Sequence, residues 1–252
     1  MKIKEAYFGY YSTGVYLPFS SLARRWRAFL ESKRGKRRRF QQDTKIPKVH
    51  WKRVIQPGRI RIVEHQKENG NVRSSELGLL SHLAKNCEDG TLLFEIGTFD
   101  GRTTMNLALN SPPRCRVITL DLPPGEKTRY ALENGEMHFV HTKTGHRYKK
   151  YAAVYPARVE KITQELGDSA QFDFSDYYES CALVFVDGSH AYDYAVSDTQ
   201  AAMRLVRTGG VVIWHDYGMW EGVTKALEEL EEKNKWGLRH IAGTSLVYWK
   251  NP

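Results

Sequence analysis

The residues best suited to chemistry follow two strongly apolar segments in the second half of the chain. Residues 182–187, ALVFVD, end in Asp187, and His190 comes three residues later. Residues 209–214, GGVVIW, are followed directly by His215 and Asp216. Apolar runs of this kind are typical of buried parallel strands, whose carboxyl ends meet at one edge of a sheet. We therefore expect these four side chains to converge on one crevice.

Two kinds of chemistry are open to this set. A histidine whose pKa is near neutral is a natural base for the proton of a hydroxyl group. Asp187 and Asp216 can instead hold a divalent cation that lowers the pKa of the hydroxyl. The residues predict Asp187, His190 and His215 as catalytic candidates, with Asp187 and Asp216 as candidate metal ligands. The plainer alternative is that the two histidines only form hydrogen bonds across the crevice.

A second set of residues, EIGTFDG at 95–101, forms a turn between an apolar strand and a helix. Glycines at such a turn let the backbone approach a ligand and let strand and helix pack closely. The diphosphate-binding pattern GxGxxG is missing, and Glu95 would repel a diphosphate but suits a sulfonium or ammonium group. Asp121 ends the next strand, about 20 residues on, where a carboxylate can bind a ribose diol. These features favour S-adenosylmethionine over NAD.

In their order along the chain, these motifs resemble those of class I S-adenosylmethionine-dependent methyltransferases, particularly the group with macrocin- and catechol-type O-methyltransferases. The similarity covers residues 74–250 and is carried by EIGTFDGRTT, ITLD, GDSAQFDF, VFVDGSHAYDY and GGVVIWHDYG. It implies that the glycine turn holds the methionine part of the cofactor, Asp121 the ribose, and Asp168 with Ser169 the adenine side. The predicted cofactor-binding residues are therefore Glu95, Gly97, Thr98, Phe99, Gly101, Asp121, Asp168, Ser169 and Asp187.

The resemblance breaks at the metal-binding pattern. Metal-dependent relatives carry an acid after the fourth strand and an Asp-Asp or Asp-Asn pair after the fifth. This sequence supplies Asp187 and Asp216, but His215 stands in the pair. Imidazole suits zinc, iron or manganese better than magnesium, so the pattern does not favour a magnesium site.

Strand and helix patterns alternate from residue 60 to the end of the chain. This alternation predicts an α/β fold, with a doubly wound, mostly parallel seven-stranded sheet of the Rossmann-like methyltransferase type and an antiparallel C-terminal strand. Residues 70–86, GNVRSSELGLLSHLAKN, read as a helix that Ser74 or Ser75 caps. Residues 122–158 form an insertion in the domain. Its second part, 137–158, is rich in His, Tyr and basic residues and is either a lid over an anionic or phenolic acceptor or an ordinary surface loop.

Positive charge is concentrated at the start of the chain. Residues 1–73 contain 19 Lys and Arg against 5 Asp and Glu, and the remaining residues contain 19 against 24. We therefore divide the chain into a basic extension, 1–59, and a methyltransferase domain, 60–252. Residues 24–53 are candidates for contact with nucleic acid or an anionic membrane surface. The alternative is a solvated tail whose amphipathic helix, 21–31, packs on its own domain or on the partner in a homo-oligomer.

The three cysteines are widely spaced, which indicates neither a zinc knuckle nor a disulfide framework. No apolar run reaches the roughly 20 residues of a membrane-spanning helix. We expect a cytoplasmic protein, with peripheral attachment to a membrane surface as a further option.

The favoured function is O-methylation of a small-molecule or glycan-type acceptor. An RNA or protein methyltransferase is a second hypothesis, but the domain is acidic and lacks an Asn/Asp-Pro-Pro-Tyr signature after the fourth strand. A metal-dependent hydroxylase on the same scaffold would use Asp187, His215 and Asp216 to hold iron. A binding module without catalysis is the remaining alternative.

Overall fold

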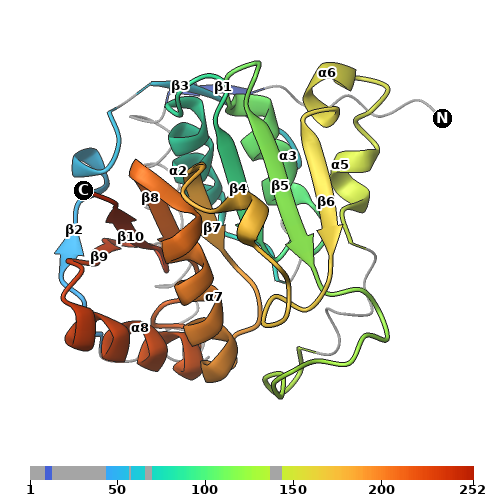
Figure 1. The fold of residues 1–252 in the computed structure, drawn as a ribbon. Helices are drawn as coiled ribbons and strands as arrows, with labels where there is room; N and C mark the ends of the chain where they lie inside the picture. The colour runs from blue at the N-terminus through green and yellow to red at the C-terminus, as the bar shows by residue number, and fades with distance from the viewer. Residues whose placement is uncertain (1–8, 13–43, 57, 66–69, 137–143) are drawn as a thin grey trace, which may run out of the picture.

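The computed structural model describes residues 9–12, 44–56, 58–65, 70–136 and 144–252, which build an α/β domain around one large sheet (Figure 1). The eight strands of this sheet lie in the order β2-β9-β10-β8-β7-β4-β5-β6. Five neighbouring pairs run parallel, and β10 runs antiparallel to both β8 and β9. The doubly wound fold with an antiparallel C-terminal strand is therefore confirmed. The strands are β2 (Lys48–Val49), β4 (Leu92–Ile96), β5 (Arg116–Asp121), β6 (Ile162–Leu166), β7 (Cys181–Val186), β8 (Val206–Trp214), β9 (Arg239–Ile241) and β10 (Val247–Lys250).

Helices cover both faces of the sheet, and the alternation of side chains along β7 shows which helices share a face. Leu183 and Phe185 belong to the core cluster beneath α2 (Ser74–Lys85) and α3 (Arg102–Asn110). Val184 and Val186 belong to the cluster beneath α7 (Tyr192–Leu205) and α8 (Glu221–Asn234). Since successive side chains of a strand point to opposite faces, the two helix pairs lie on opposite sides (Figure 1).

The eighth strand, β2, comes from the predicted extension and pairs in parallel with β9. Around it Ile46, Trp51 and Ile55 are buried in the domain, and the short helix η1 (Trp51–Arg53) follows. The sheet thus has one strand more than predicted, and residues 44–56 pack on the domain rather than belonging to a separate tail. Burial of three apolar side chains among exposed basic ones accounts for this difference.

Two local expectations differ in detail from the structure. The strand and helix pattern expected from residue 60 begins with β3 (Arg59–Ile62), but this strand pairs with β1 (Gly9–Ser12) in a separate two-stranded sheet. The helix α2 begins at Ser74, yet its cap is Arg73, whose backbone N–H donates to a carboxylate oxygen of Glu76 at 2.8 Å. A glutamate in the third helical position therefore completes the cap, in place of a serine hydroxyl.

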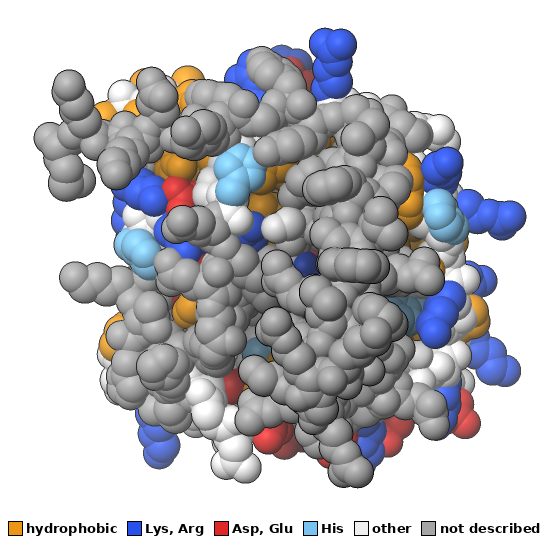
Figure 2. Space-filling model, turned by 180° about the vertical axis from the view of Figure 1, so that it is seen from behind, with side chains coloured by type: hydrophobic (Ala, Val, Ile, Leu, Met, Phe, Trp, Pro, Cys, Tyr) orange, Lys and Arg blue, Asp and Glu red, His pale blue; other side chains and the backbone are white. Residues whose placement is uncertain are grey.

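The insertion contains two short helices, α5 (His146–Lys149) and α6 (Pro156–Val159), and η2 (Ser175–Tyr177) follows β6. The helix predicted at residues 21–31 lies outside the described residues, as do residues 24–43 of the basic segment, so contact with a polyanion stays a prediction. Lys and Arg side chains are visible along the rim of the molecule in Figure 2. Among the described residues, no helix combines the length and the apolar character needed to cross a membrane.

Candidate active site

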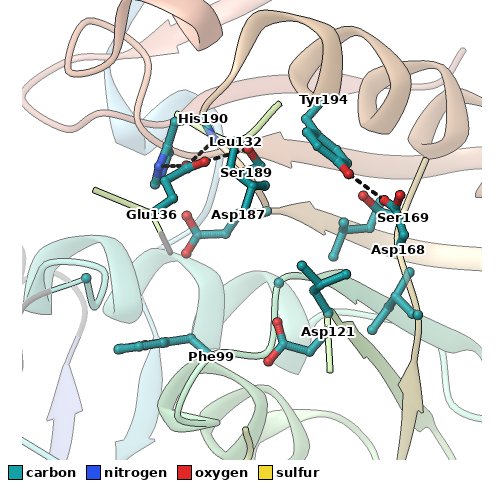
Figure 3. Close-up of a pocket in the computed structure, with 17 residues that line it drawn as sticks. Phe99, Asp121, Leu132, Glu136, Asp168, Ser169, Asp187, Ser189, His190 and Tyr194 are labelled. Atoms are coloured by element: carbon teal, nitrogen blue, oxygen red, sulfur yellow. Dashed lines mark hydrogen bonds and ion pairs between the residues drawn. The ribbon is translucent and has the colours of Figure 1, made fainter. Parts of the chain in front are cut away.

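A pocket of about 880 Å³ opens at the carboxyl edge of the parallel strands (Figure 3). The turns after β4, β5, β6 and β7 supply its walls, because parallel strands all end at this edge. Seven of the predicted site residues line it, namely Gly97, Phe99, Asp121, Asp168, Ser169, Asp187 and His190.

Gly97 lies directly against the backbone at the end of β7. Its φ is +99°, and a β-carbon there would stand 2.0 Å from the carbonyl oxygen of Asp187. Only glycine fits this position, since both the backbone angle and the space exclude a side chain. Phe99 also has a positive φ, of 49°, which is uncommon for an aromatic residue and holds its ring at the pocket wall (Figure 3). The turn is therefore shaped for close approach of a ligand.

Glu95 and Thr98 were predicted to bind the cofactor, but neither lines the pocket. The Glu95 carboxylate is fully buried and accepts hydrogen bonds from the hydroxyls of Thr104, at 2.5 Å, and Thr119, at 2.7 Å. The Thr98 hydroxyl lies 2.7 Å from that of Thr119. Burial raises the pKa of Glu95 to about 8 against the opposing effect of the two hydrogen bonds. In this structure both residues join the turn to the sheet and α3 instead of lining the pocket.

Gly101 likewise does not line the pocket, and its conformation serves the contact with the insertion. Its φ is +85°, and a β-carbon would lie 2.7 Å from the ring of Tyr148 and 2.9 Å from the α-carbon of Gly145. The backbone N–H of Gly145 donates to the carbonyl of Phe99 at 2.8 Å. The insertion is thus docked directly on the glycine turn, which the sequence alone does not indicate.

Buried charges reinforce this docking. Arg147 of α5 is 4% exposed, and its guanidinium lies 3.1 Å from Asp100 and 3.6 Å from Glu64. Asp100 also accepts from the side-chain amide of Asn71 at 2.9 Å. A buried ion pair needs such additional hydrogen bonds to offset the loss of hydration. The turn is therefore held between the insertion and the segment that precedes α2.

Asp121 and Asp168 lie at different walls of the pocket and differ in their bonding (Figure 3). Burial raises the pKa of Asp121 to about 7, while backbone N–H groups of the turn oppose the shift. The Asp168 carboxylate accepts from the Tyr194 hydroxyl and the Arg129 backbone N–H, both at 2.7 Å. These and further bonds lower the pKa of Asp168 despite its burial. The Asp168 carboxylate is thus bonded to other parts of the pocket wall, whereas the Asp121 carboxylate is more available to a ligand.

The two histidines and two aspartates converge as predicted, but each imidazole is held between carboxylates. His215 is buried, with Nδ1 2.8 Å from Asp187 and 3.3 Å from Asp216. Its Nε2 lies 3.4 Å from Glu76 of α2. Burial opposes protonation of this ring, yet the carboxylates raise its pKa well above the usual range. His215 does not line the pocket and is no free base in this arrangement.

The imidazole of His190, on the other side of Asp216, also lies between two carboxylates. Its Nε2 lies 2.8 Å from Asp216, and its Nδ1 forms an ion pair with Glu136. The ring stacks on Trp220, with 4.5 Å between centroids and 6° between planes. Although burial opposes it, these carboxylates raise the pKa of His190 to about 10. The imidazole is therefore protonated at neutral pH when nothing else is bound to it.

The donor atoms of this cluster match a cation site. One atom each from Asp187, His190 and Asp216 lies within 4.8 Å of the other two. The charged histidines lower the pKa of Asp216, whereas burial raises that of Asp187. Asp216 has a φ of 61°, an uncommon conformation for a residue other than glycine. Two carboxylates and one imidazole are a donor set that binds divalent transition metals.

Three further acidic residues lie in or beside this site, and the sequence does not single them out. Glu76 and Glu136 face the histidines from α2 and from the insertion, respectively. Asp198 of α7 resembles a surface residue in the sequence but is 1% exposed, and burial raises its pKa to about 7. Its carboxylate lies beside Gly188, where a β-carbon would stand 2.8 Å from it. No local sequence pattern indicates any of these three positions.

Comparison with known proteins places these residues in a family. Residues 94–217, which include both motif strands and the histidine cluster, match a family model described as a methyltransferase domain. Among curated proteins, none matches the sequence. The solved structure of the calicheamicin methyltransferase CalS11 aligns with a TM-score of 0.53 at 15% identity, over 69% of this chain and 77% of CalS11. The O-methyltransferase NovP aligns with a TM-score of 0.55 at 18% identity, over 70% of this chain and 79% of NovP.

At such identities the structural likeness shows a shared fold, and the family match covers the glycine turn, Asp121 and the cluster at the ends of β7 and β8. The chain therefore contains a methyltransferase domain on a Rossmann-like methyltransferase fold.

Proposed function

We propose that the protein transfers the methyl group of S-adenosylmethionine to a hydroxyl oxygen of a small-molecule or glycan-type acceptor. The observation that carries this proposal is that Asp187 belongs to two parts of the site at once. It lines the pocket that we assign to the cofactor, and its carboxylate belongs to the cluster with His190 and Asp216. A hydroxyl placed beside the cofactor's methyl group would therefore meet groups suited to handling its proton.

The pocket residues fit the parts of the cofactor. The space that a β-carbon on Gly97 would fill lets the turn approach the methionine part. Asp121 faces the pocket with a carboxylate able to accept two hydrogen bonds from the ribose diol, and Asp168 and Ser169 line the side that we assign to adenine. Bound here, S-adenosylmethionine supplies a methyl group attached to a sulfonium. The acceptor oxygen bonds to this carbon as the carbon–sulfur bond breaks, so alignment of the two is the main contribution of the protein.

Neither imidazole alone is suited to take the acceptor proton, because the ring nitrogens of both already face carboxylates, which raise the pKa of each ring. We propose instead that Asp187, His190 and Asp216 hold a divalent cation. Such an ion supplies Lewis acidity that lowers the pKa of a bound hydroxyl. Because Asp187 also lies at the pocket wall, a cation held by this cluster would stand beside the acceptor hydroxyl.

The names of the structural neighbours support transfer to oxygen. NovP is an O-methyltransferase, and CalS11 is a calicheamicin methyltransferase. Both align over more than two thirds of this chain. A hydroxyl acceptor agrees with the cation-binding donor set, because coordination activates oxygen nucleophiles in particular.

Binding tests the cofactor assignment. Thermal unfolding of the full chain is measured with S-adenosylmethionine, S-adenosylhomocysteine and NAD in parallel. We expect the two sulfur ligands to raise the melting temperature and NAD to leave it unchanged, since a ligand that binds only the folded state stabilises it. Absence of a shift with either sulfur ligand would overturn the cofactor assignment.

Transfer tests the acceptor class and the metal. The metal-depleted protein is supplied with methyl-labelled S-adenosylmethionine, panels of phenolic, sugar and amine acceptors, and magnesium, manganese, iron or zinc. We expect label on hydroxyl acceptors only, dependent on an added cation and lost in Asp216→Asn. Label on amines alone would contradict O-methylation, and full activity without any cation would contradict the metal. Copurified stoichiometric iron with no transfer would favour the hydroxylase.

A further inference from the structure

The first part of the insertion, residues 122–136, crosses the mouth of the cofactor pocket. Leu122, Leu132 and Glu136 line the pocket, whereas residues 124–127, 131 and 134–135 of the same segment are exposed. Such a segment has little apolar contact to hold it, so its position depends on a few specific bonds. We call residues 122–136 the strap.

One group of these bonds lies on the side assigned to adenine. The backbone N–H of Arg129 donates to Asp168 at 2.7 Å, and its guanidinium donates to the carbonyl of Ala170 at 3.2 Å. The ring of Tyr130 packs edge-on against Tyr194, with 5.5 Å between centroids. The middle of the strap is thus attached to the turn after β6 and to α7.

Glu136 makes the other attachment, and it does so at the reaction cluster (Figure 3). One carboxylate oxygen accepts from the Ser189 hydroxyl at 2.6 Å and from the Glu133 backbone N–H at 2.8 Å. The other accepts from the backbone N–H of His190 at 2.5 Å and pairs with Nδ1 of the same residue. Glu136 is 5% exposed, so these bonds replace nearly all of its contact with water.

The contact with His190 determines how its ring is turned. With Nδ1 on Glu136, Nε2 is directed to Asp216 at 2.8 Å, and Trp220 covers one face of the ring. A carboxylate on the second nitrogen of a site histidine fixes the orientation and tautomer of the ring. The same side chain therefore both fastens the strap and orients a residue of the cluster.

We propose that Glu136 is a positioning residue for methyl transfer: it closes the strap over the cofactor and holds the His190 ring with Nε2 presented to Asp216. Cofactor retention and assembly of the reaction cluster are coupled through this one carboxylate. The inference rests on the proposed function for the identity of the ligand beneath the strap. The attachment itself is independent of that identity.

Limited trypsin digestion of the full chain tests the attachment, because Lys127 and Arg129 are exposed cleavage sites within the strap. The test variant is Glu136→Gln, whose amide has only one accepting oxygen and so cannot accept from both the Ser189 hydroxyl and the His190 backbone N–H. The control is Glu126→Gln, which removes the same charge from an exposed position of the strap. We expect faster cleavage after Lys127 and Arg129 in Glu136→Gln only, with cleavage elsewhere unchanged.

Binding and kinetics complete the test. In Glu136→Gln we expect the Kd for S-adenosylhomocysteine to rise and kcat to fall about 10- to 100-fold, the usual cost of losing a partner that orients a site histidine, with little change in the acceptor KM. Wild-type cleavage and affinity in the variant would overturn the proposal. So would uniformly faster cleavage with a lower melting temperature, which indicates a structural role only. If no form of the protein binds S-adenosylhomocysteine, the cofactor assignment fails, while the ligand-free digestion still decides whether Glu136 fastens the strap.

Discussion

Nδ1 of His215 lies 2.8 Å from Oδ1 of Asp187, and Nε2 on the other side of the ring lies 3.4 Å from Glu76. This histidine therefore links α2 to the strand end that borders the cofactor pocket. Each ring nitrogen already has a carboxylate partner, so the ring orients Asp187 rather than acting on the acceptor. The catalytic role predicted for His215 becomes, in our proposal, the positioning of Asp187.

Replacement of His215 should separate chemistry from cofactor binding. In His215→Gln we expect kcat to fall about 10- to 100-fold, because Asp187 loses the partner that orients it. The Kd for S-adenosylhomocysteine should change little, since His215 does not line the pocket. The matched control is His240→Gln, a buried histidine bonded to the carbonyl of Thr244. Equal losses of kcat in both variants would contradict the role of His215.

Replacement of Gly97 should affect both folding and binding. In Gly97→Ala the positive φ costs about 1–3 kcal/mol, and the contact with the Asp187 carbonyl adds about 1–3 kcal/mol of overpacking. Gly90→Ala is the control, because Gly90 has a φ of +88° and a β-carbon added there would meet no atom within 4 Å. Denaturant unfolding of the two variants separates backbone strain from the steric clash. Equal stabilities would show that the turn can move away from β7.

The sheet was predictable from local patterns, whereas the surroundings of the site were not. Apolar strands alternating with amphipathic helices indicate the fold, and Gly97, Asp121 and Asp187 follow strand ends that must share an edge. Whether the Glu95 side chain faces the pocket depends on packing that no local pattern records. Glu136 reaches His190 across 54 positions of sequence, and an isolated glutamate in a polar loop carries no signal of that contact.

The stability of the protein should depend on pH through Glu95. The ordinary pKa of this glutamate, which applies to the unfolded chain, is 4.5, and burial in the folded protein raises it to about 8. The folded state therefore binds the proton more tightly than the unfolded state does. The resulting stabilisation is complete below pH 4.5 and is lost as the pH rises toward 8, by up to about 1.4 kcal/mol per pH unit.

Glu95→Gln tests this dependence because the amide does not ionise and its oxygen can still accept hydrogen bonds from threonine hydroxyls. We expect denaturant unfolding between pH 5 and 8 to show a smaller loss of stability in the variant than in the wild type. Asp121 and Asp198, whose pKa values are also raised, remain in both proteins. Parallel pH profiles would mean that Glu95 is ionised in the folded protein.

Docking of the insertion should depend on Arg147. Arg147→Met leaves Asp100 and Glu64 without their buried cation, and breaking a buried pair in this way costs about 3–5 kcal/mol. The control, Arg114→Met, breaks an exposed pair with Asp89 and should cost about 0–1 kcal/mol. Chemical denaturation measures both changes. Similar small losses would show that the insertion does not rely on these charges.

The central claim is that the pocket bounded by Gly97, Asp121 and Asp187 binds S-adenosylmethionine. Calorimetric titration of S-adenosylhomocysteine into the wild type and into Asp121→Ala tests it most directly. We predict one saturable site in the wild type, a large loss of affinity in Asp121→Ala, and folded protein in both cases. Absence of binding to the wild type, or equal affinity in the variant, would contradict the placement of the cofactor.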